Sequence, residues 1–323
     1  MEVRADKERI MLLKKRIEEG SEELSKLLSD SKAVIETNIN NAITDSKFVG
    51  SGARQKKLYN QLAKDYAELG AALDGLTRDQ MTQTASDSFK QQLDTFKSSG
   101  GAQTFGTFSK EHLDNIIGKF SPSAVHGSTA INAVAGGMLQ NDVRTLRASV
   151  SKVMAEANIT GMTRRESTRE LVREVKRKGT FQFIDKAGRK WNTKSYFEML
   201  NDTMHEVADR ETTIAQGTDA GFDLYQIDGG QTAESLRYPN DPCSRWAGKI
   251  ISMTGKTEGY PTYQDAIDDR MFHPRCAHWL SPVSKTGLPS AKRDEAKQDA
   301  QGKAGRAKVN KERKEDGLSP AKF

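Results

Sequence analysis

Apolar residues recur every seven positions through the first 45 residues, and this spacing limits the fold more than any other feature of the chain. One row is Val3, Ile10, Ile17 and Leu24, and the adjacent row is Leu13, Leu27 and Val34. Such spacing places the side chains along one stripe of an α-helix. Because Gly20 and Ser31 interrupt the stripe, the pattern favours a helical hairpin or a partner helix over a long coiled coil.

Helical patterns continue through residues 51–100. A second helix is predicted to begin near Ser51, and its apolar face is Leu58, Leu62, Tyr66, Leu69 and Leu73. Thr77 and Gln80 have the spacing of a capping box, which predicts that a third helix begins there. The Ser-Ser-Gly-Gly run at 98–101 indicates a linker.

Residues 101–178 are expected to form a helical connector. A long helix is predicted from Thr129 towards Ala157. Thr163 and Glu166 have capping-box spacing, and Gly179 follows a basic run, so a second, well-capped helix is predicted between them.

The periodicity changes after residue 179. Residues 180–184 alternate like a strand, 185–188 have turn composition and 189–191 resume the strand, which predicts a hairpin. A helix is expected from Thr193 to about Gly217. Further elements are predicted as strands at 222–227, 249–253 and 277–280 and a helical turn at 264–269. The predicted fold class is mainly α in the N-terminal half, with long helices and helical hairpins, then a small α+β domain and a basic irregular tail.

These patterns divide the chain into four segments. They are a helical region at 1–100, the connector at 101–178, the α+β domain at 179–283 and a flexible tail at 284–323. Only 35% of residues are hydrophobic and 29% are charged, so we expect modest cores and large solvated helix surfaces. Trp191, Trp246 and Trp279 are expected to be at least partly buried in the α+β domain.

No segment of the sequence has the pattern of a signal peptide or a membrane span. Residues 1–20 are charged throughout, and the longest apolar stretch, at 133–139, is too short to cross a bilayer. Cys243 and Cys276 are too few for a disulfide scaffold, and we expect their thiols to be close but unbridged in a reducing cytoplasm.

The tail at 284–323 carries most of the excess positive charge. It holds eleven Lys and Arg against six Asp and Glu, a balance of +5 out of +6 for the whole chain. One interpretation is a solvated tail. The other is contact with phosphate groups, because clustered Lys and Arg bind nucleic acid without reading its sequence.

The cysteines and two histidines form the main candidate for chemistry. Cys243, His273, Cys276 and His278 have the ligand types of a tetrahedral zinc site. Against zinc, the first ligand is a lone cysteine rather than a Cys-x-x-Cys pair. The alternative is that Cys243 packs near Cys276 while His273 forms a hydrogen bond at a turn. No P-loop, dinucleotide-binding or nucleophile-elbow motif is present in the sequence.

Three motifs in order give the C-terminal half a recognisable signature. They are Asp-Pro-Cys-Ser-Arg-Trp-Ala-Gly-Lys-Ile at 241–250, Tyr-Pro-Thr-Tyr at 260–263 and Phe-His-Pro-Arg-Cys-Ala-His-Trp-Leu at 272–280. Together with the hairpin and helix before them, they resemble the Mu F-like minor head proteins of tailed bacteriophages, over roughly residues 163–283. The chain departs from many relatives by having Trp246 in place of a second cysteine and Ala277 in place of an arginine.

The resemblance implies a structural minor capsid protein and not an enzyme. Such a protein is made in the host bacterial cytoplasm and is located in the virion, in the capsid interior or near the portal. It would act in head morphogenesis with the portal and other head proteins and leave with the genome. The charge of residues 284–323 adds the expectation that this tail contacts DNA. Two alternatives remain open: a zinc- or cysteine-dependent hydrolase, such as a toxin or head-maturation factor, and a free nucleic-acid-binding factor.

Overall fold

The computed structural model describes residues 2–98, 131–185, 187–228, 243, 246–274, 276 and 278–283. It separates into two compact units. The first unit takes its described residues from Met1–Ile10, Thr84–Ile116 and Glu206–Phe323, and the second from Met11–Gln83 and Ile117–His205. The predicted 179–283 segment therefore contributes to both units. No helix in the described residues is long and apolar enough to cross a membrane.

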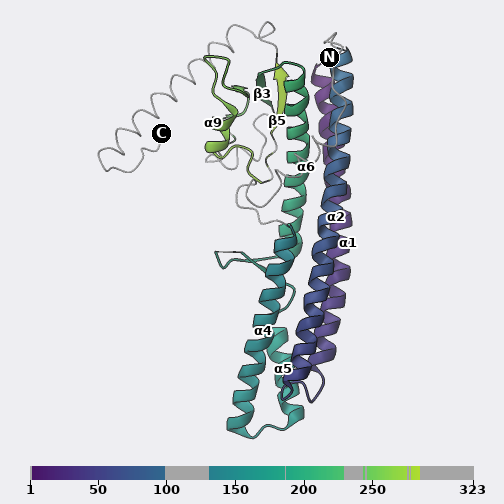
Figure 1. Cartoon of the computed structure of the whole chain (residues 1–323), viewed down its shortest axis with the longest axis vertical. Helices are drawn as coiled ribbons and strands as arrows, with labels where there is room; N and C mark the ends of the chain where they lie inside the picture. The colour runs from purple at the N-terminus through teal and green to yellow at the C-terminus, as the bar shows by residue number, and fades with distance from the viewer. Residues whose placement is uncertain are drawn as a thin grey trace, which may run out of the picture. The chain divides into compact units, whose positions relative to one another are not determined.

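Helices dominate both units, as Figure 1 shows. The helices are α1 (Glu2–Ile43), α2 (Gly52–Ser98), α4 (Ile131–Thr160), α5 (Arg164–Lys178), α6 (Thr193–Asp219) and α9 (Tyr263–Asp268). The strands are β1 (Phe183–Ile184), β2 (Lys190–Trp191), β3 (Leu224–Asp228), β4 (Ile250–Ser252) and β5 (Trp279–Val283). Long helices and small antiparallel sheets confirm the predicted fold class. Of the predicted 98–101 linker, Ser98 ends α2, whereas residues 99–101 and the tail at 284–323 lie outside the described residues.

Helices α1 and α2 form the predicted helical hairpin in the second unit. The turn between them buries Phe48 and Val49, and the Gln55 side chain donates hydrogen bonds to both of their carbonyls. Along the hairpin, the Asn38 amide donates to Asp65 at 2.8 Å. The two helices lie side by side in Figure 1.

The buried face of α1 differs from the predicted one. Its core residues in this unit are Leu24, Leu28, Ile35, Ile39 and Ile43. Val34, which was expected on the apolar stripe, is 54% exposed. The prediction was wrong for Val34, whereas Leu13 and Leu27 of the same row are partly buried. The fully buried side chains follow the spacing of a straight helix rather than a strict seven-residue repeat.

The predicted face of α2 is confirmed, but the predicted break at Thr77 is wrong. All five apolar residues of that face are buried. The helix continues through Thr77, whose hydroxyl donates to the Leu73 carbonyl at 2.7 Å instead of capping a new helix. The Gln80 side chain donates from Nε2 to Glu23 at 3.0 Å, so it extends towards α1 instead of back towards Thr77.

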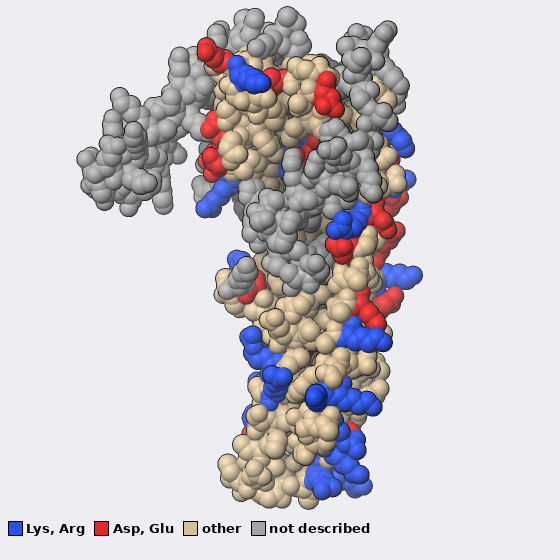
Figure 2. Space-filling model, in the orientation of Figure 1, with Lys and Arg blue, Asp and Glu red and all other residues tan. Residues whose placement is uncertain are grey.

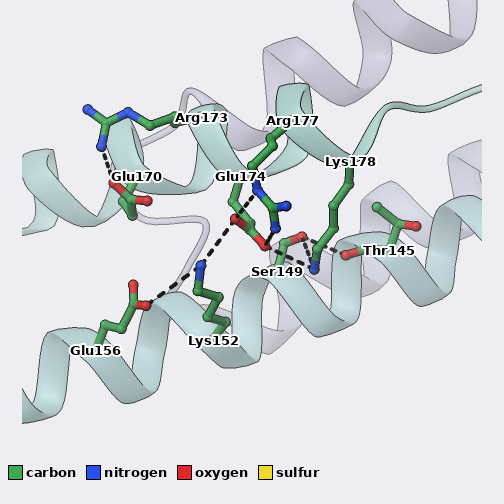
Figure 3. A network of polar contacts seen from close by, with 9 residues as sticks. All are labelled: Thr145, Ser149, Lys152, Glu156, Glu170, Arg173, Glu174, Arg177 and Lys178. Atoms are coloured by element: carbon green, nitrogen blue, oxygen red, sulfur yellow. Dashed lines mark hydrogen bonds and ion pairs between the residues drawn. The ribbon is translucent and has the colours of Figure 1, made fainter.

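Helices α4 and α5 pack on each other around a buried carboxylate, Glu174. Figure 3 shows Lys152 of α4 and Arg177 and Lys178 of α5 converging on it, at 3.2, 2.8 and 3.2 Å. Hydrogen bonds, led by that from Arg177, lower the pKa of Glu174 to about 2 against the effect of burial. The capping box of Thr163 and Glu166 that starts α5 is confirmed, as is its end at Gly179.

A second buried carboxylate, Asp142 of α4, joins three segments of the same unit. It accepts a hydrogen bond from the Tyr66 hydroxyl of α2 at 2.6 Å and from the Phe181 amide at 3.1 Å. Phe181 is buried with a left-handed backbone, at φ 56°. This conformation delays the start of the predicted 180–184 strand to Phe183, and the confirmed hairpin pairs only Phe183 with Trp191 and Ile184 with Lys190.

The first unit contains an antiparallel sheet in the order β4-β3-β5. In its register Gln226 lies between Ile250 of β4 and Ser281 of β5. Arg9 of α1 attaches the helices to this sheet. Its guanidinium binds Asp209 of α6 through two nitrogens, at 3.0 and 2.5 Å, and donates to the Leu280 carbonyl of β5 at 3.3 Å.

Gly20 is a point of close approach, so we predict that Gly20→Ala destabilises the protein by about 1–3 kcal/mol. A Cβ there would lie 2.6 Å from Asn201 Oδ1 and 2.8 Å from His205 Nε2. Asn201 cannot shift freely, because its amide donates to the Ile17 carbonyl at 3.0 Å. The measurement is urea unfolding.

Gly75→Ala is the matched control for this prediction. Gly75 is also helical, but a Cβ added to it would meet nothing within 4 Å. Alanine should therefore stabilise by up to about 1 kcal/mol through helix propensity alone. Equal effects of the two substitutions would contradict the close approach at Gly20.

We predict that Asp142→Asn changes how stability depends on pH. Burial raises the pKa of Asp142 from 3.8 to about 6. The stabilising contribution of this carboxyl is thus present below pH 4 and lost as pH rises through about 6. From pH 4 to 7 the free energy of unfolding of the variant should rise by about 3 kcal/mol relative to the wild type. Asp74→Asn, at an exposed carboxyl of α2, is the control, and an equally flat difference for both variants would refute the raised pKa.

Candidate metal site

Cys243 lies in a helical turn held against one end of β3. The Ala247 amide donates to the Cys243 carbonyl at 3.0 Å, and the Gly248 amide donates to the Ile227 carbonyl at 2.7 Å. Gly248 has a φ of 78°, a left-handed conformation that favours glycine. This turn holds Cys243 near the end of the central strand β3, with 1% of its surface exposed.

Cys276 and His278 approach the same place from the segment that leads into β5. The Cys276 amide donates to the His273 carbonyl at 3.0 Å, which closes a turn just before the strand. Residues 276, 278 and 280 are all buried, as expected where side chains alternate between the two faces of an extended segment. Cys276 and His278 therefore point the same way, as the sequence predicted.

The ligand atoms of these three residues converge. The Sγ atoms of Cys243 and Cys276 are 3.3 Å apart, and Cys276 Sγ is 3.6 Å from His278 Nδ1. One ligand atom from each of the three residues lies within 4.8 Å of the others. The 3.3 Å separation of the two sulfurs confirms the prediction that the thiols lie close together.

His273, the fourth predicted ligand, is not in this group. Its Nδ1 faces the Pro274 carbonyl at 2.9 Å, and the side chain is only partly buried. This agrees with the alternative that His273 forms a hydrogen bond at a turn. The structure therefore brings together three of the four candidates.

A comparison with known protein families gives a match that includes the whole α+β region. The family model for phage minor capsid protein 2 matches residues 90–314, which is more than half of the chain. This chain belongs to the phage minor capsid protein 2 family. The prediction of a phage minor capsid protein is thereby confirmed. Neither the search of curated proteins nor the search of solved structures gave a significant match.

The minor capsid protein surrounds its Cys–His cluster with an apolar core. Trp246, Met271, Phe272 and Leu280 belong to the same buried cluster as the two cysteines. Trp246 is fixed by a hydrogen bond from its ring nitrogen to Asp269 at 2.7 Å. The prediction that all three tryptophans are at least partly buried is confirmed, although Trp191 lies in the other unit.

One residue that sequence reasoning missed is Arg210 of α6. Its guanidinium carbon lies 4.5 Å from the ring centroid of Phe272, and the side chain is buried. This cation–π contact places a positive charge against the core that holds Cys276. Its only signal in the sequence is a charged residue next to the inward-facing positions of a predicted helix, which is too common to identify it.

The cluster has the groups of a cysteine nucleophile, but those groups are buried. The hydrogen bond from Cys243, together with contacts from His278, lowers the pKa of the Cys276 thiol well below its usual value. A nucleophilic thiolate must also reach a substrate carbonyl. Cys276 is 3% exposed and His278 7%, so this arrangement supports a packed or metal-binding cluster better than the hydrolase alternative.

Proposed function

We propose that this minor capsid protein is a non-enzymatic component of the phage head, located inside the capsid near the portal. Membership of the minor capsid family is the observation that carries the structural role, and it implies other phage head proteins as partners. The long helices suit this role, because they offer a large lateral surface in proportion to their cores. The finer placement, beside the portal, is our proposal.

The surface that we assign to the portal lies at one end of the second unit. A groove of about 500 Å³ there lies between the α1–α2 turn and the α4–α5 turn, and is lined by Val49, Met154 and Met162. Met154 is 42% exposed and Ile159 84%. Arg54 and Arg164 line the same groove, and Figure 2 shows Lys and Arg gathered at this end of the second unit. Apolar side chains flanked by positive charge fit an acidic, partly apolar surface of a portal subunit.

The placement predicts three properties of purified virions. The protein should be present in them, survive protease treatment of intact particles, and form cross-links from Lys47, which lines the groove, to the portal subunit. Absence from virions would overturn the structural role. Digestion in intact particles would overturn the interior location, and cross-links to another head protein alone would overturn the portal assignment.

The proposed contact with DNA rests on the tail at 284–323, which lies outside the described residues. Its eleven basic residues would release counterions from phosphates. A chain ending at Val283 should therefore bind DNA more weakly than the full chain, with a shallower dependence of log affinity on log salt. A full-length chain with the eleven tail Lys and Arg changed to Gln is the control for tail length. Equal affinity and salt slope in all three proteins would refute DNA contact through the tail.

A further inference from the structure

We propose that Cys243, Cys276 and His278 bind a zinc ion that fastens the turn at Cys243 to the segment entering β5. The assignment goes beyond the role in the head, which does not require a metal. It rests on convergence of three buried ligand groups from two segments of the first unit. These are the only residues in the described part of the chain that form such a group with cysteine or histidine ligands.

The distances between the ligand atoms resemble the edges of a zinc tetrahedron. With bonds of about 2.3 Å to sulfur and about 2.0 Å to nitrogen, tetrahedral zinc places two sulfurs about 3.7 Å apart and sulfur and nitrogen about 3.5 Å apart. The two sulfurs are 3.3 Å apart, and Cys276 Sγ lies 3.6 Å from His278 Nδ1. All three ligand atoms lie within 4.8 Å of one another, so binding would require at most a small shift of the side chains.

The ligand types select the metal. Two thiolates and an imidazole are soft or borderline donors, which suit zinc. Magnesium and calcium are poor fits because they prefer oxygen ligands. His273 stays outside the group, so three protein ligands come from this cluster and the fourth position of the ion belongs to another donor.

Burial gives an energetic reason for an ion in this place. His278 Nδ1 and the sulfurs of Cys243 and Cys276 lie together inside an apolar core, and Nδ1 faces the Cys276 sulfur at 3.6 Å. Burial of polar groups costs free energy, and coordination of these three atoms to one ion would offset that cost. The cluster also lies where the sheet is small, since β4 has three residues and β5 has five. Free energy from binding zinc would become folding free energy for this part of the unit.

The test measures metal in the full chain, purified under reducing conditions without chelators. Elemental analysis should find equimolar zinc, and Co²⁺ exchanged into the protein should give thiolate-to-metal absorption and tetrahedral d–d bands. Cys243→Ser, Cys276→Ser and His278→Ala should each lose the metal. His273→Ala is the matched control, and it should retain zinc because the structure leaves His273 outside the cluster.

A measurement on the unsubstituted protein avoids relying on variants that fail to fold. Removing zinc with a chelator should lower the melting temperature, and adding zinc should restore it. Free thiols with no uptake of zinc or Co²⁺ would overturn the proposal, as would a stoichiometric disulfide in unreduced protein by mass spectrometry. Loss of zinc from His273→Ala would overturn the three-residue ligand set.

Discussion

The buried ion pair between Arg9 and Asp209 is the interaction on which the first unit depends. Arg9 lies on α1 and Asp209 on α6, 200 residues apart in sequence, and Arg9 also reaches the β5 carbonyl of Leu280. Ser88 of α2 donates to the same carboxylate at 2.6 Å. Three helices and a strand thus share one set of charge-assisted hydrogen bonds. Removing either charge would leave the other buried and unpaired, which would lower the free energy of unfolding by about 3–5 kcal/mol. The ion pair therefore enforces contact between distant segments.

In the second unit, two buried carboxylates also join separate segments, but the pKa of Glu174 is lowered and the pKa of Asp142 is raised. Three cationic side chains surround Glu174, so its charged form is stabilised and α4 is joined to α5. Asp142 accepts its hydrogen bonds from two neutral groups, the Tyr66 hydroxyl and the Phe181 amide, so burial dominates and its charged form is disfavoured. Polar side chains therefore specify which helices pack together, in a chain whose apolar residues are too few to specify it alone.

Local patterns predicted much of this fold, and long-range contacts explain the failures. The capping box at Thr163 depends on residues three apart, so the sequence contains everything needed to recognise it. Thr77 has the same spacing, yet Gln80 contacts α1, which local reasoning cannot detect. At the candidate site, the spacing of Cys276 and His278 predicted that they share a face. Excluding His273 required the turn geometry, and finding Arg210 or Arg9 required the tertiary structure.

The candidate metal site and the buried ion pair act on the same strand. Arg9 of α1 donates a hydrogen bond to the Leu280 carbonyl of β5. Cys276 and His278 lie in the segment that leads into β5. Leu280 itself packs in the core cluster with both cysteines. Because β5 pairs along all of β3, a shift of its first residues would disturb the register that Ile227 shares with Leu280. An ion at the cluster would therefore add a restraint at the start of the strand, next to the pairing with β3 and the hydrogen bond from Arg9.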